Sequence, residues 1–456
     1  MSTSVSPAAP AAVGRDAPLT LTEPTDQSLG LRDALGLWGN LGISLLLPVA
    51  AAFVILPGSP FGPTLLAIVV GAAIGSVLLG LGAAAGAREG APAMVLMRGL
   101  LGRRISYLPT VFNLVQCVGW ATFEIVVIAE AASRVLNAPT WPFLLGAGGL
   151  ATLMALRPLR TVRVLARYAV WLALAGVVYL FVRVLAQPLP EFTAAGAISF
   201  WTAVDVVIAL PVSWFPLAAD YTRHVRSGRS AFTGAAIGYG TATVAFFMLG
   251  TLALAAYGRG GFDVIDALLA IPLGAAAILI LVLVEVDEAF ANVYSTAVSA
   301  QNISPRLDRR LLALVVGALA TTLAFTIDIV GYEPFLFLIG AVFVPLVGVF
   351  VVAYYLVPRQ RWDVSEQAPA RPWLLLPWAA GFVAYQLTLP THFADTFAGW
   401  TQWWTARQAD LGISPTNGLS ASLVSLTVAA LLTVVVCLPQ ILRGRGRRPS
   451  REVVQR

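Results

Sequence analysis

Residues 40–48 read Asn-Leu-Gly-Ile-Ser-Leu-Leu-Leu-Pro, and residues 209–216 read Ala-Leu-Pro-Val-Ser-Trp-Phe-Pro. Both stretches place proline inside a long apolar run, where it removes a backbone donor and frees a carbonyl group. Hydrocarbon tolerates such breaks only where protein or a cavity surrounds them. Breaks at matching places in two five-helix halves are typical of inverted-repeat membrane proteins. We therefore predict an all-α polytopic membrane protein with a five-helix inverted-repeat core and discontinuous helices 1 and 6.

The composition supports a membrane location along the whole chain. Of its 456 residues, 58% are hydrophobic and 11% are charged, whereas soluble domains carry about 25% charged residues. At roughly 20 apolar residues per span, the length accommodates about 12 transmembrane helices. We expect these spans at residues 34–57, 63–86, 106–135, 139–157, 163–185, 198–219, 231–257, 267–300, 310–330, 333–357, 372–390 and 417–442.

Arginines gather in alternate loops, which predicts the orientation of the chain. They follow the even-numbered spans, so the positive-inside rule places both termini in the cytoplasm of a bacterium, with the protein in the inner membrane. This placement also explains the net charge of +6 without nucleic acid as a partner. The expected domains are a disordered tail (1–30), a ten-helix core (31–360), two peripheral helices (361–442) and a basic tail (443–456).

Residue types that serve catalysis or cofactor binding are sparse. Cys117 and Cys437 lie in apolar runs and are expected as buried thiols, and His224 and His392 lie in predicted loops, where we expect surface histidines. We find no phosphate-binding loop, zinc motif or nucleophile elbow. The sequence therefore predicts no enzyme, no cofactor and no obligatory protein partner.

Span 8 carries three acids in four residues, Glu285, Asp287 and Glu288, followed by Asn292. Glu285, Glu288 and Asn292 share one helical face because they are spaced at i, i+3 and i+7. Charged groups inside a membrane are costly and indicate function. Three acids this close cannot all be ionised without a cation or a proton. Either they bind an ion such as Na⁺ or at least one of them carries a proton.

Spans 3 and 6 supply aromatic and amide groups. Gln116, Trp120 and Glu124 form a stripe along span 3, while Ser213, Trp214 and Phe215 lie between the two prolines of span 6. Indole rings stack on planar molecules, and amide or carboxylate groups read their edges. A carboxylate also accepts paired hydrogen bonds from an aminopyrimidine edge. These residues favour a planar heteroaromatic ligand.

Several segments together resemble the nucleobase:cation symporter family, which includes the cytosine and purine permeases. The segments cover roughly residues 30–360 and are Trp38–Gly42, Gly86–Pro92, Arg98–Gly102, Gln116–Trp120, Pro216–Arg223, Phe335–Gly340 and Pro345–Gly348. Residues 286–295, together with Val344-Pro345, look most similar to the CytX-like branch, whose members are presumed to carry hydroxymethylpyrimidine.

The resemblance implies a five-helix inverted-repeat core of the LeuT type that works by alternating access. It also implies a ligand held between Trp120 and either Trp214 or Phe215, with polar contacts from Gln116 and Asn292. It further implies a cation on span-1 carbonyl groups, here near Gly42 and Leu45, and on hydroxyl groups of span 8. Val286 and Asp287 occupy those hydroxyl positions in this chain. Asp287 would therefore bind Na⁺ or carry a proton, so the coupling ion is H⁺ or Na⁺.

Taken together, these features predict secondary active import of a nucleobase-like aminopyrimidine, either hydroxymethylpyrimidine or cytosine. Gln116, Trp120, Glu124, Ser213, Trp214, Phe215, Glu288 and Asn292 would bind it, and Gly42, Leu45 and Asp287 would bind the cation. The partners are this small molecule and the lipid bilayer. The alternative is a transporter of amino acids or other small solutes on the same scaffold, which would leave the acids of span 8 unexplained.

Overall fold

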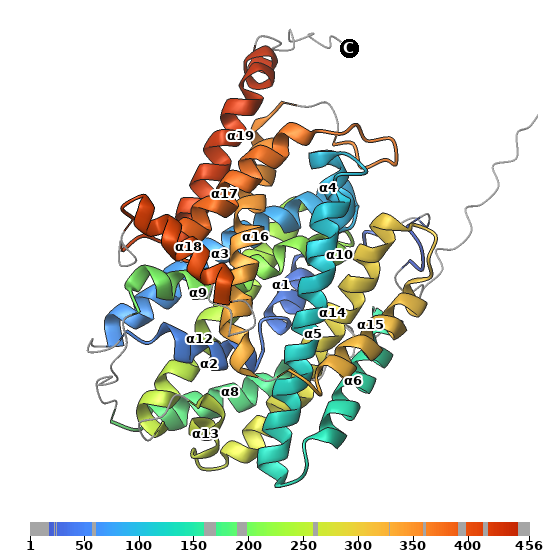
Figure 1. Ribbon diagram of the computed structural model, residues 1–456. Coiled ribbons are helices and arrows are strands. Elements are labelled where there is room, and N and C mark those ends of the chain that lie inside the picture. Colours follow the sequence, from blue (N-terminus) through green and yellow to red (C-terminus); the bar gives the residue numbers. More distant parts are fainter. Residues whose placement is uncertain are drawn as a thin grey trace, which may run out of the picture.

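A computed structural model describes residues 18–21, 23, 25–56, 61–158, 170–188, 198–258, 263–327, 329–358, 362–390, 398–413 and 418–445. Helices account for the regular structure of these residues, together with one isolated bridge between Leu29 and Val225. The helices form a single bundle in which α5 and α14 run side by side through the centre (Figure 1).

The first half of the bundle begins with a broken helix. Its elements are α1 (Leu31–Asn40), α2 (Leu46–Ala50) with η1 (Ala51–Val54), α3 (Phe61–Glu89), α4 (Ala93–Leu101), α5 (Tyr107–Leu136), α6 (Trp141–Leu156) and α8 (Val170–Leu185). Residues 41–45 separate α1 from α2, so the predicted discontinuity of helix 1 is confirmed.

The second half also begins with a broken helix and continues to two outer helices. Its elements are α9 (Phe200–Ser213), α10 (Phe215–Thr222), α11 (Gly228–Thr233), η3 (Gly234–Tyr239), α12 (Gly240–Tyr257), α13 (Val264–Leu269), α14 (Gly274–Ile303), α15 (Arg309–Leu323), η4 (Ile329–Gly331), α16 (Tyr332–Val351) and η5 (Val352–Leu356). The outer elements are η6 (Pro372–Leu374), α17 (Leu375–Thr388), α18 (Ala398–Asp410) and α19 (Ala421–Arg445). The chain is interrupted at Trp214, so the break in helix 6 is confirmed as well.

The structure departs from the predicted spans around α13 and at α18. The span expected at 267–300 is two helices, α13 and α14, because Leu273 adopts a left-handed conformation with φ of 57° between them. Helix α18 occupies part of a predicted loop, because its polar composition gives no span signal. Of the span expected at 163–185, residues 163–169 lie outside the described residues.

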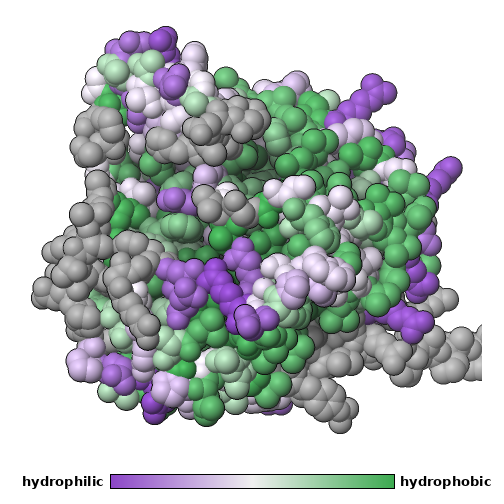
Figure 2. Space-filling model, turned by 60° about the horizontal axis from the view of Figure 1, so that its bottom comes forward, coloured by the Kyte–Doolittle hydropathy of each residue, from purple (hydrophilic) through white to green (hydrophobic). Residues whose placement is uncertain are grey.

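Six helices of the described chain are long and apolar enough to cross a membrane by length and composition. Apolar side chains cover much of the face shown in Figure 2, with hydrophilic residues gathered in patches. Helix α14 has 30 residues, as long as α5, but carries three acids in the middle. Exposed apolar side chains such as Val115, Leu153 and Val435 suit contact with lipid.

Glycines on α3 allow helix 6 to approach it closely. A Cβ atom added to Gly71 would lie 2.8 Å from the Val204 carbonyl oxygen, and one added to Gly86 would lie 2.5 Å from the Ala219 Cβ atom. Small residues permit such backbone contact between membrane helices. The packing holds the broken helix 6 firmly against α3, so that its interruption lies beside α5 and α14 in the interior.

The described residues before α1 cross one end of the bundle. The Leu19 carbonyl oxygen accepts hydrogen bonds from the Arg309 backbone and the Gln301 side chain, and the Leu29 backbone pairs with His224 and Arg226. These contacts lie in a segment expected as a disordered tail. They join the α14–α15 loop to the α10–α11 loop at the same end of the molecule.

Candidate functional site

The break in helix 6 exposes a backbone carbonyl group to a side chain of α5. Leu217 donates its N–H to Trp214 (3.1 Å) rather than to Ser213, as a regular helix would require. The Ser213 carbonyl oxygen instead accepts from Gln116 Nε2 at 2.9 Å. Gln116 Nε2 also donates to Asn113 Oδ1 at 2.8 Å. The amide of Gln116 therefore stabilises the break.

Two acids of α14 bind the break in helix 1. The Glu285 carboxylate accepts from the Ser44 hydroxyl at 2.8 Å and from the Leu45 N–H at 2.5 Å. Asn40 Nδ2 donates to the carboxylate of Asp287. Both side chains are buried. Since residues 41–45 form no regular helix, these carboxylates supply acceptors that the helix itself lacks.

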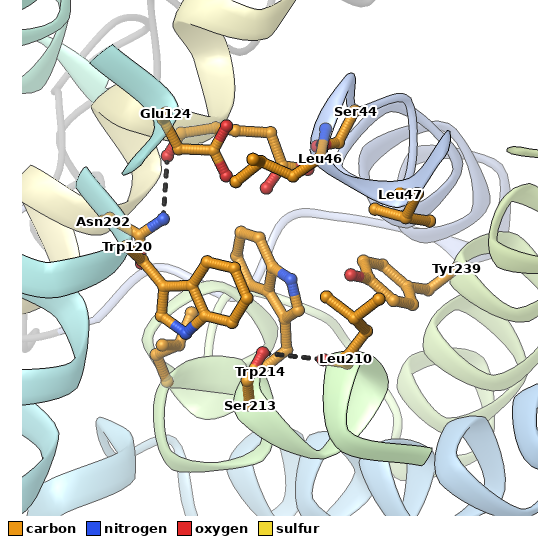
Figure 3. A pocket seen from close by; sticks show the side chains of 12 residues that line it. Ser44, Leu46, Leu47, Trp120, Glu124, Leu210, Ser213, Trp214, Tyr239 and Asn292 are labelled. Carbon is orange, nitrogen blue, oxygen red and sulfur yellow. Dashed lines mark hydrogen bonds between the residues drawn. The ribbon is translucent and has the colours of Figure 1, made fainter. Parts of the chain in front are cut away.

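Both breaks border one small internal space (Figure 3). Its volume is about 10 Å³, which is room for about one water molecule. It is lined by Ser44, Leu46, Leu47, Trp120, Glu124, Leu210, Ser213, Trp214, Leu217, Tyr239, Glu288 and Asn292. Elements far apart in the sequence therefore meet here, and a ligand larger than a water molecule enters only when some of them move.

The two tryptophans at this space are held by other aromatic rings. Trp214 meets Trp38 edge to face with the ring centroids 5.9 Å apart, and Tyr239 lies 5.9 Å from it. Trp120 meets Phe335 edge to face at 5.3 Å. Edge-to-face packing fixes ring orientation and adds stability beyond the buried area. Both indoles are thus positioned to contact a planar ligand.

Several polar atoms around the space have no hydrogen-bond partner within the described residues. They are Glu124 Oε2, Glu288 Oε1, Gln116 Oε1 and Trp120 Nε1. Buried polar groups are normally paired, because leaving one unpaired costs about 1–3 kcal/mol. Asn292 donates to the Glu288 backbone carbonyl at 3.1 Å (Figure 3), which leaves the Glu288 side chain open. Three acceptors and one donor are therefore available to a ligand.

The structure brings most of the predicted ligand residues together. Those that line the space are Trp120, Glu124, Ser213, Trp214, Glu288 and Asn292. Gln116 reaches its edge through the Ser213 carbonyl. Phe215 does not line it, because its ring packs against Gly82 and lies 5.4 Å from the ring of Phe350. Of the two aromatic alternatives in helix 6, Trp214 is the one at the space.

The predicted cation residues lie near the break in helix 1. A Cβ atom at Gly42 would come within 2.5 Å of the Ala242 Cβ atom, so this glycine permits close packing against α12. Leu45 presents its N–H to Glu285, and Asp287 is bound by Asn40. In the described part of the chain, no group of three or more His, Cys, Asp or Glu side chains is arranged to hold a metal ion.

Sequence reasoning gave no site role to Asn40, Ser44 or Tyr239, and it considered Glu285 only as one of the three acids of span 8 that bind an ion or carry a proton. Asn40 ends α1 directly before the break in helix 1, and Ser44 lies in the break, so the local pattern could have indicated both. Tyr239 ends the π-helical segment η3. No pattern in the sequence predicts that segment, although π-helical turns are frequent at functional sites.

His224 lies outside the spans, between α10 and α11, and is buried, so the prediction of a surface histidine is wrong. Its Nδ1 donates to the Asp26 carbonyl oxygen at 3.0 Å, and its Nε2 has no hydrogen-bond partner in the described structure. Burial, with a smaller contribution from Arg223, lowers the pKa of His224 to about 4. His392 lies outside the described residues. Cys117 and Cys437 are buried free thiols, as predicted.

The family comparison agrees with this arrangement of helices and polar groups. Residues 25–372 match the family described as permeases for cytosine/purines, uracil, thiamine and allantoin. The chain belongs to this family. It is therefore a multi-pass membrane transporter rather than an enzyme, and the predicted membership of the nucleobase:cation symporters is confirmed.

Curated relatives include two cytosine permeases. The one from Escherichia coli O157:H7 is 27% identical and the one from strain K12 is 26% identical, each over 310 residues that cover 64% of this chain and 70% of the relative.

Solved structures share the fold. A closed conformation of Mhp1, a nucleobase-cation-symport-1 family transporter with bromovinylhydantoin bound, has a TM-score of 0.72 at 18% identity and covers 92% of this chain and 95% of its own. A Na⁺-coupled sialic acid symporter has a TM-score of 0.64 at 11% identity, with 93% of each chain covered. The predicted LeuT-type inverted-repeat fold is confirmed by these likenesses.

Proposed function

We propose that this permease imports an aminopyrimidine, hydroxymethylpyrimidine or cytosine, by symport with H⁺ or Na⁺. The observation that carries the proposal is the space between the two helix breaks, where Trp120 and Trp214 meet the open carboxylates of Glu124 and Glu288. Indoles stack on a planar ring, and carboxylates accept from its amino groups. The curated relatives named as cytosine permeases support the same class of ligand.

The ligand binds with its ring between the two indoles and its edge toward polar side chains. Gln116 and Asn292 carry amides that both donate and accept hydrogen bonds, and Ser213 contributes the carbonyl group of the break. The space of about 10 Å³ is far smaller than the 300 Å³ or more of a typical ligand pocket. The structure therefore represents a closed state, and binding requires the alternating-access motion of the two halves.

The cation binds beside the break in helix 1, with Gly42, Leu45 and Asp287 as the candidate residues. The buried acids of α5 and α14 support a positive charge here, because no arginine is among the groups that interact with Glu124, Glu285, Asp287 or Glu288 in the described chain. Several buried carboxylates without a basic partner require a proton or a metal cation for charge balance. Asp287, where a hydroxyl residue would be expected, binds Na⁺ or carries the proton.

Both termini face the cytoplasm of a bacterial cell, with the transporter in its inner membrane. Arginine-bearing segments support this orientation: Arg223, Arg226 and Arg309 lie at the same end of the bundle as the described residues before α1. Positively charged residues concentrate at the cytoplasmic ends of membrane helices.

Uptake into proteoliposomes tests the function. Purified protein is reconstituted in Na⁺-free vesicles, and uptake of radiolabelled cytosine and hydroxymethylpyrimidine is followed under an imposed H⁺ gradient, an imposed Na⁺ gradient or neither. We expect accumulation above the equilibrium level with one of the two gradients, and its loss in Asp287→Asn. Correctly inserted protein that accumulates neither pyrimidine under either gradient would disprove the proposed substrate class.

A further inference from the structure

The four buried acids at the site divide into two pairs with different surroundings. Glu285 accepts from Ser44 and Leu45 in the break of helix 1, and Asp287 accepts from Asn40 at the end of α1 directly before it. Glu124 and Glu288 line the internal space, and each keeps one carboxylate oxygen without a hydrogen-bond partner among the described residues. Asp287 also has one oxygen, Oδ1, without a partner among the described residues, but it does not line the space. The second pair is therefore the one that faces a ligand there.

The open oxygens lie on facing helices and belong to nearly inaccessible side chains. Glu124 is 2% exposed on α5, and Glu288 is 3% exposed on α14. Asn292 lies one turn after Glu288 on the same face. It donates to the Glu288 backbone carbonyl group and not to the Glu288 side chain, whose Oε1 stays without a partner among the described residues. An ionised carboxylate only accepts hydrogen bonds. In its ionised form, Glu288 therefore pairs with a donor such as an amino group.

This requirement separates two kinds of pyrimidine. Cytosine and hydroxymethylpyrimidine carry an amino group on the ring edge, whereas uracil carries a carbonyl oxygen at that position. A carbonyl oxygen against a buried carboxylate leaves two acceptors facing each other without a proton between them. Sites that hydrogen-bond a ligand reject an analogue that lacks the matching group, because their own buried polar atoms are then left unpaired.

We propose that Glu288 is the residue that selects an amino-bearing ring over a carbonyl-bearing one, with Glu124 as the second acceptor for the ligand edge. This inference rests on the proposed function and adds to it the atom that discriminates between substrates: the open Oε1 of Glu288. Glu285 and Asp287 take no part in this selection, because neither lines the internal space and each is bound by residues at the break in helix 1.

Competition binding with purified protein tests the assignment. Radiolabelled cytosine is bound to wild-type protein and displaced by unlabelled cytosine, hydroxymethylpyrimidine or uracil, which gives the ratio of affinities for amino- and carbonyl-bearing rings. We expect the amino-bearing rings to bind about 10- to 100-fold more tightly, the range for one hydrogen bond to a charged group. The same series is then measured in Glu288→Gln with labelled cytosine and labelled uracil.

In Glu288→Gln, the side chain keeps its size but gains an amide that donates as well as accepts. The cytosine-to-uracil ratio should fall about 10- to 100-fold. Glu288→Asp retains the carboxylate and should keep the preference while weakening both ligands. Glu130→Gln is the matched control: Glu130 lies on α5 away from the space, pairs with Arg134 at 3.6 Å, and should leave the ratio unchanged.

Three outcomes would overturn the assignment. An equal loss of both ligands in Glu288→Gln would give Glu288 a structural role, and a wild-type preference for uracil would remove the amino selection while leaving a nucleobase transporter. Folded wild-type protein that binds none of the three pyrimidines would overturn the proposed function along with this inference. Thermal unfolding of each variant identifies any that has not folded. If Glu288→Gln has not folded, the affinity ratio of Glu288→Asp tests the assignment, because this variant should keep the preference for amino-bearing rings.

Discussion

Asp205 and Glu288 are both buried carboxylates inside membrane helices, but their oxygens are satisfied in different ways. Asp205 on α9 accepts from the Ser420 hydroxyl at 2.5 Å, the Ala421 N–H at 2.7 Å and the Ser422 N–H at 3.1 Å. It thereby caps α19, one of the outer helices at the edge of the bundle in Figure 1. Glu288 has an oxygen with no partner among the described residues, at an internal space.

The difference shows that burial alone does not identify a functional acid. Both side chains are at most 3% exposed, and intramembrane acids are usually taken as functional candidates. The three donors around Asp205 belong to the start of α19, so this carboxylate stabilises the contact between α9 and α19. An open acceptor beside a space indicates a ligand instead. The predictions below separate the two roles, from the largest expected effect to the smallest.

The largest effect is expected for Asp205→Ala. It leaves two backbone N–H groups of α19 buried without an acceptor, which costs about 3 kcal/mol or more. Thermal unfolding in detergent should show a clear loss of stability, while the cytosine-to-uracil affinity ratio stays at the wild-type value. Glu288→Gln should instead change the cytosine-to-uracil affinity ratio without a comparable loss of thermal stability. A changed cytosine-to-uracil ratio in Asp205→Ala would contradict the assignment of a structural role to Asp205 and a ligand-binding role to Glu288.

His224 is a third buried titratable group, and we expect it to lower the stability of the folded protein at acidic pH. Its pKa in the folded protein is about 4, below the unfolded value near 6.5, so folding favours the neutral ring. The contribution to stability is complete above pH 6.5 and is lost as the pH falls from 6.5 toward 4. By pH 5 the loss is about 2 kcal/mol.

Melting temperatures of detergent-solubilised protein at pH 7 and pH 5 check this prediction. His224→Gln should reduce the drop between the two pH values, whereas His392→Gln, at the only other histidine of the chain, should keep it. An equal drop in wild type and His224→Gln would show that other groups control acid sensitivity.

Trp120→Ala should weaken pyrimidine binding by about 10- to 100-fold, because stacking of a base on an aromatic ring contributes about 1–3 kcal/mol. Equilibrium binding of radiolabelled cytosine measures this loss. Trp403→Ala on α18 is the control, since Trp403 is exposed and lies outside the site. Wild-type affinity in folded Trp120→Ala would remove this ring from the binding site.

The smallest effect on binding is expected for Phe215→Leu. Its ring packs against Gly82 and Phe350 rather than lining the space, so the affinity should stay within about twofold of wild type. Stability should fall by about 1 kcal/mol, as for other changes of shape in a packed core. Cytosine titrations and melting curves measure both quantities. A loss of affinity above tenfold would show that Phe215 reaches the ligand in a state other than this one.

The fold was largely predictable, because its signals are local. Apolar runs mark the spans, and Pro48, Pro211 and Pro216 mark the two breaks. The faces of α14 also followed from helical spacing, which placed Glu285, Glu288 and Asn292 together. These features depend only on neighbours along the chain.

The sequence did not predict which of the buried acids bind helix 1 and which line the internal space. It depends on partners distant in sequence: Asp287 is bound by Asn40, 247 positions away, and Glu285 by Ser44, 241 positions away. The choice between Trp214 and Phe215 depends on the backbone angles at the break, and Tyr239 reaches the site from a π-helical turn. Local patterns carry no information about these contacts.

A cryo-electron microscopy structure of the protein with hydroxymethylpyrimidine bound tests the central claim most directly. The account predicts the ring between Trp120 and Trp214, with its amino group within hydrogen-bond distance of Glu288 Oε1 and the internal space opened to hold it. A pyrimidine bound elsewhere, or bound with its amino group turned away from both Glu124 and Glu288, would contradict it.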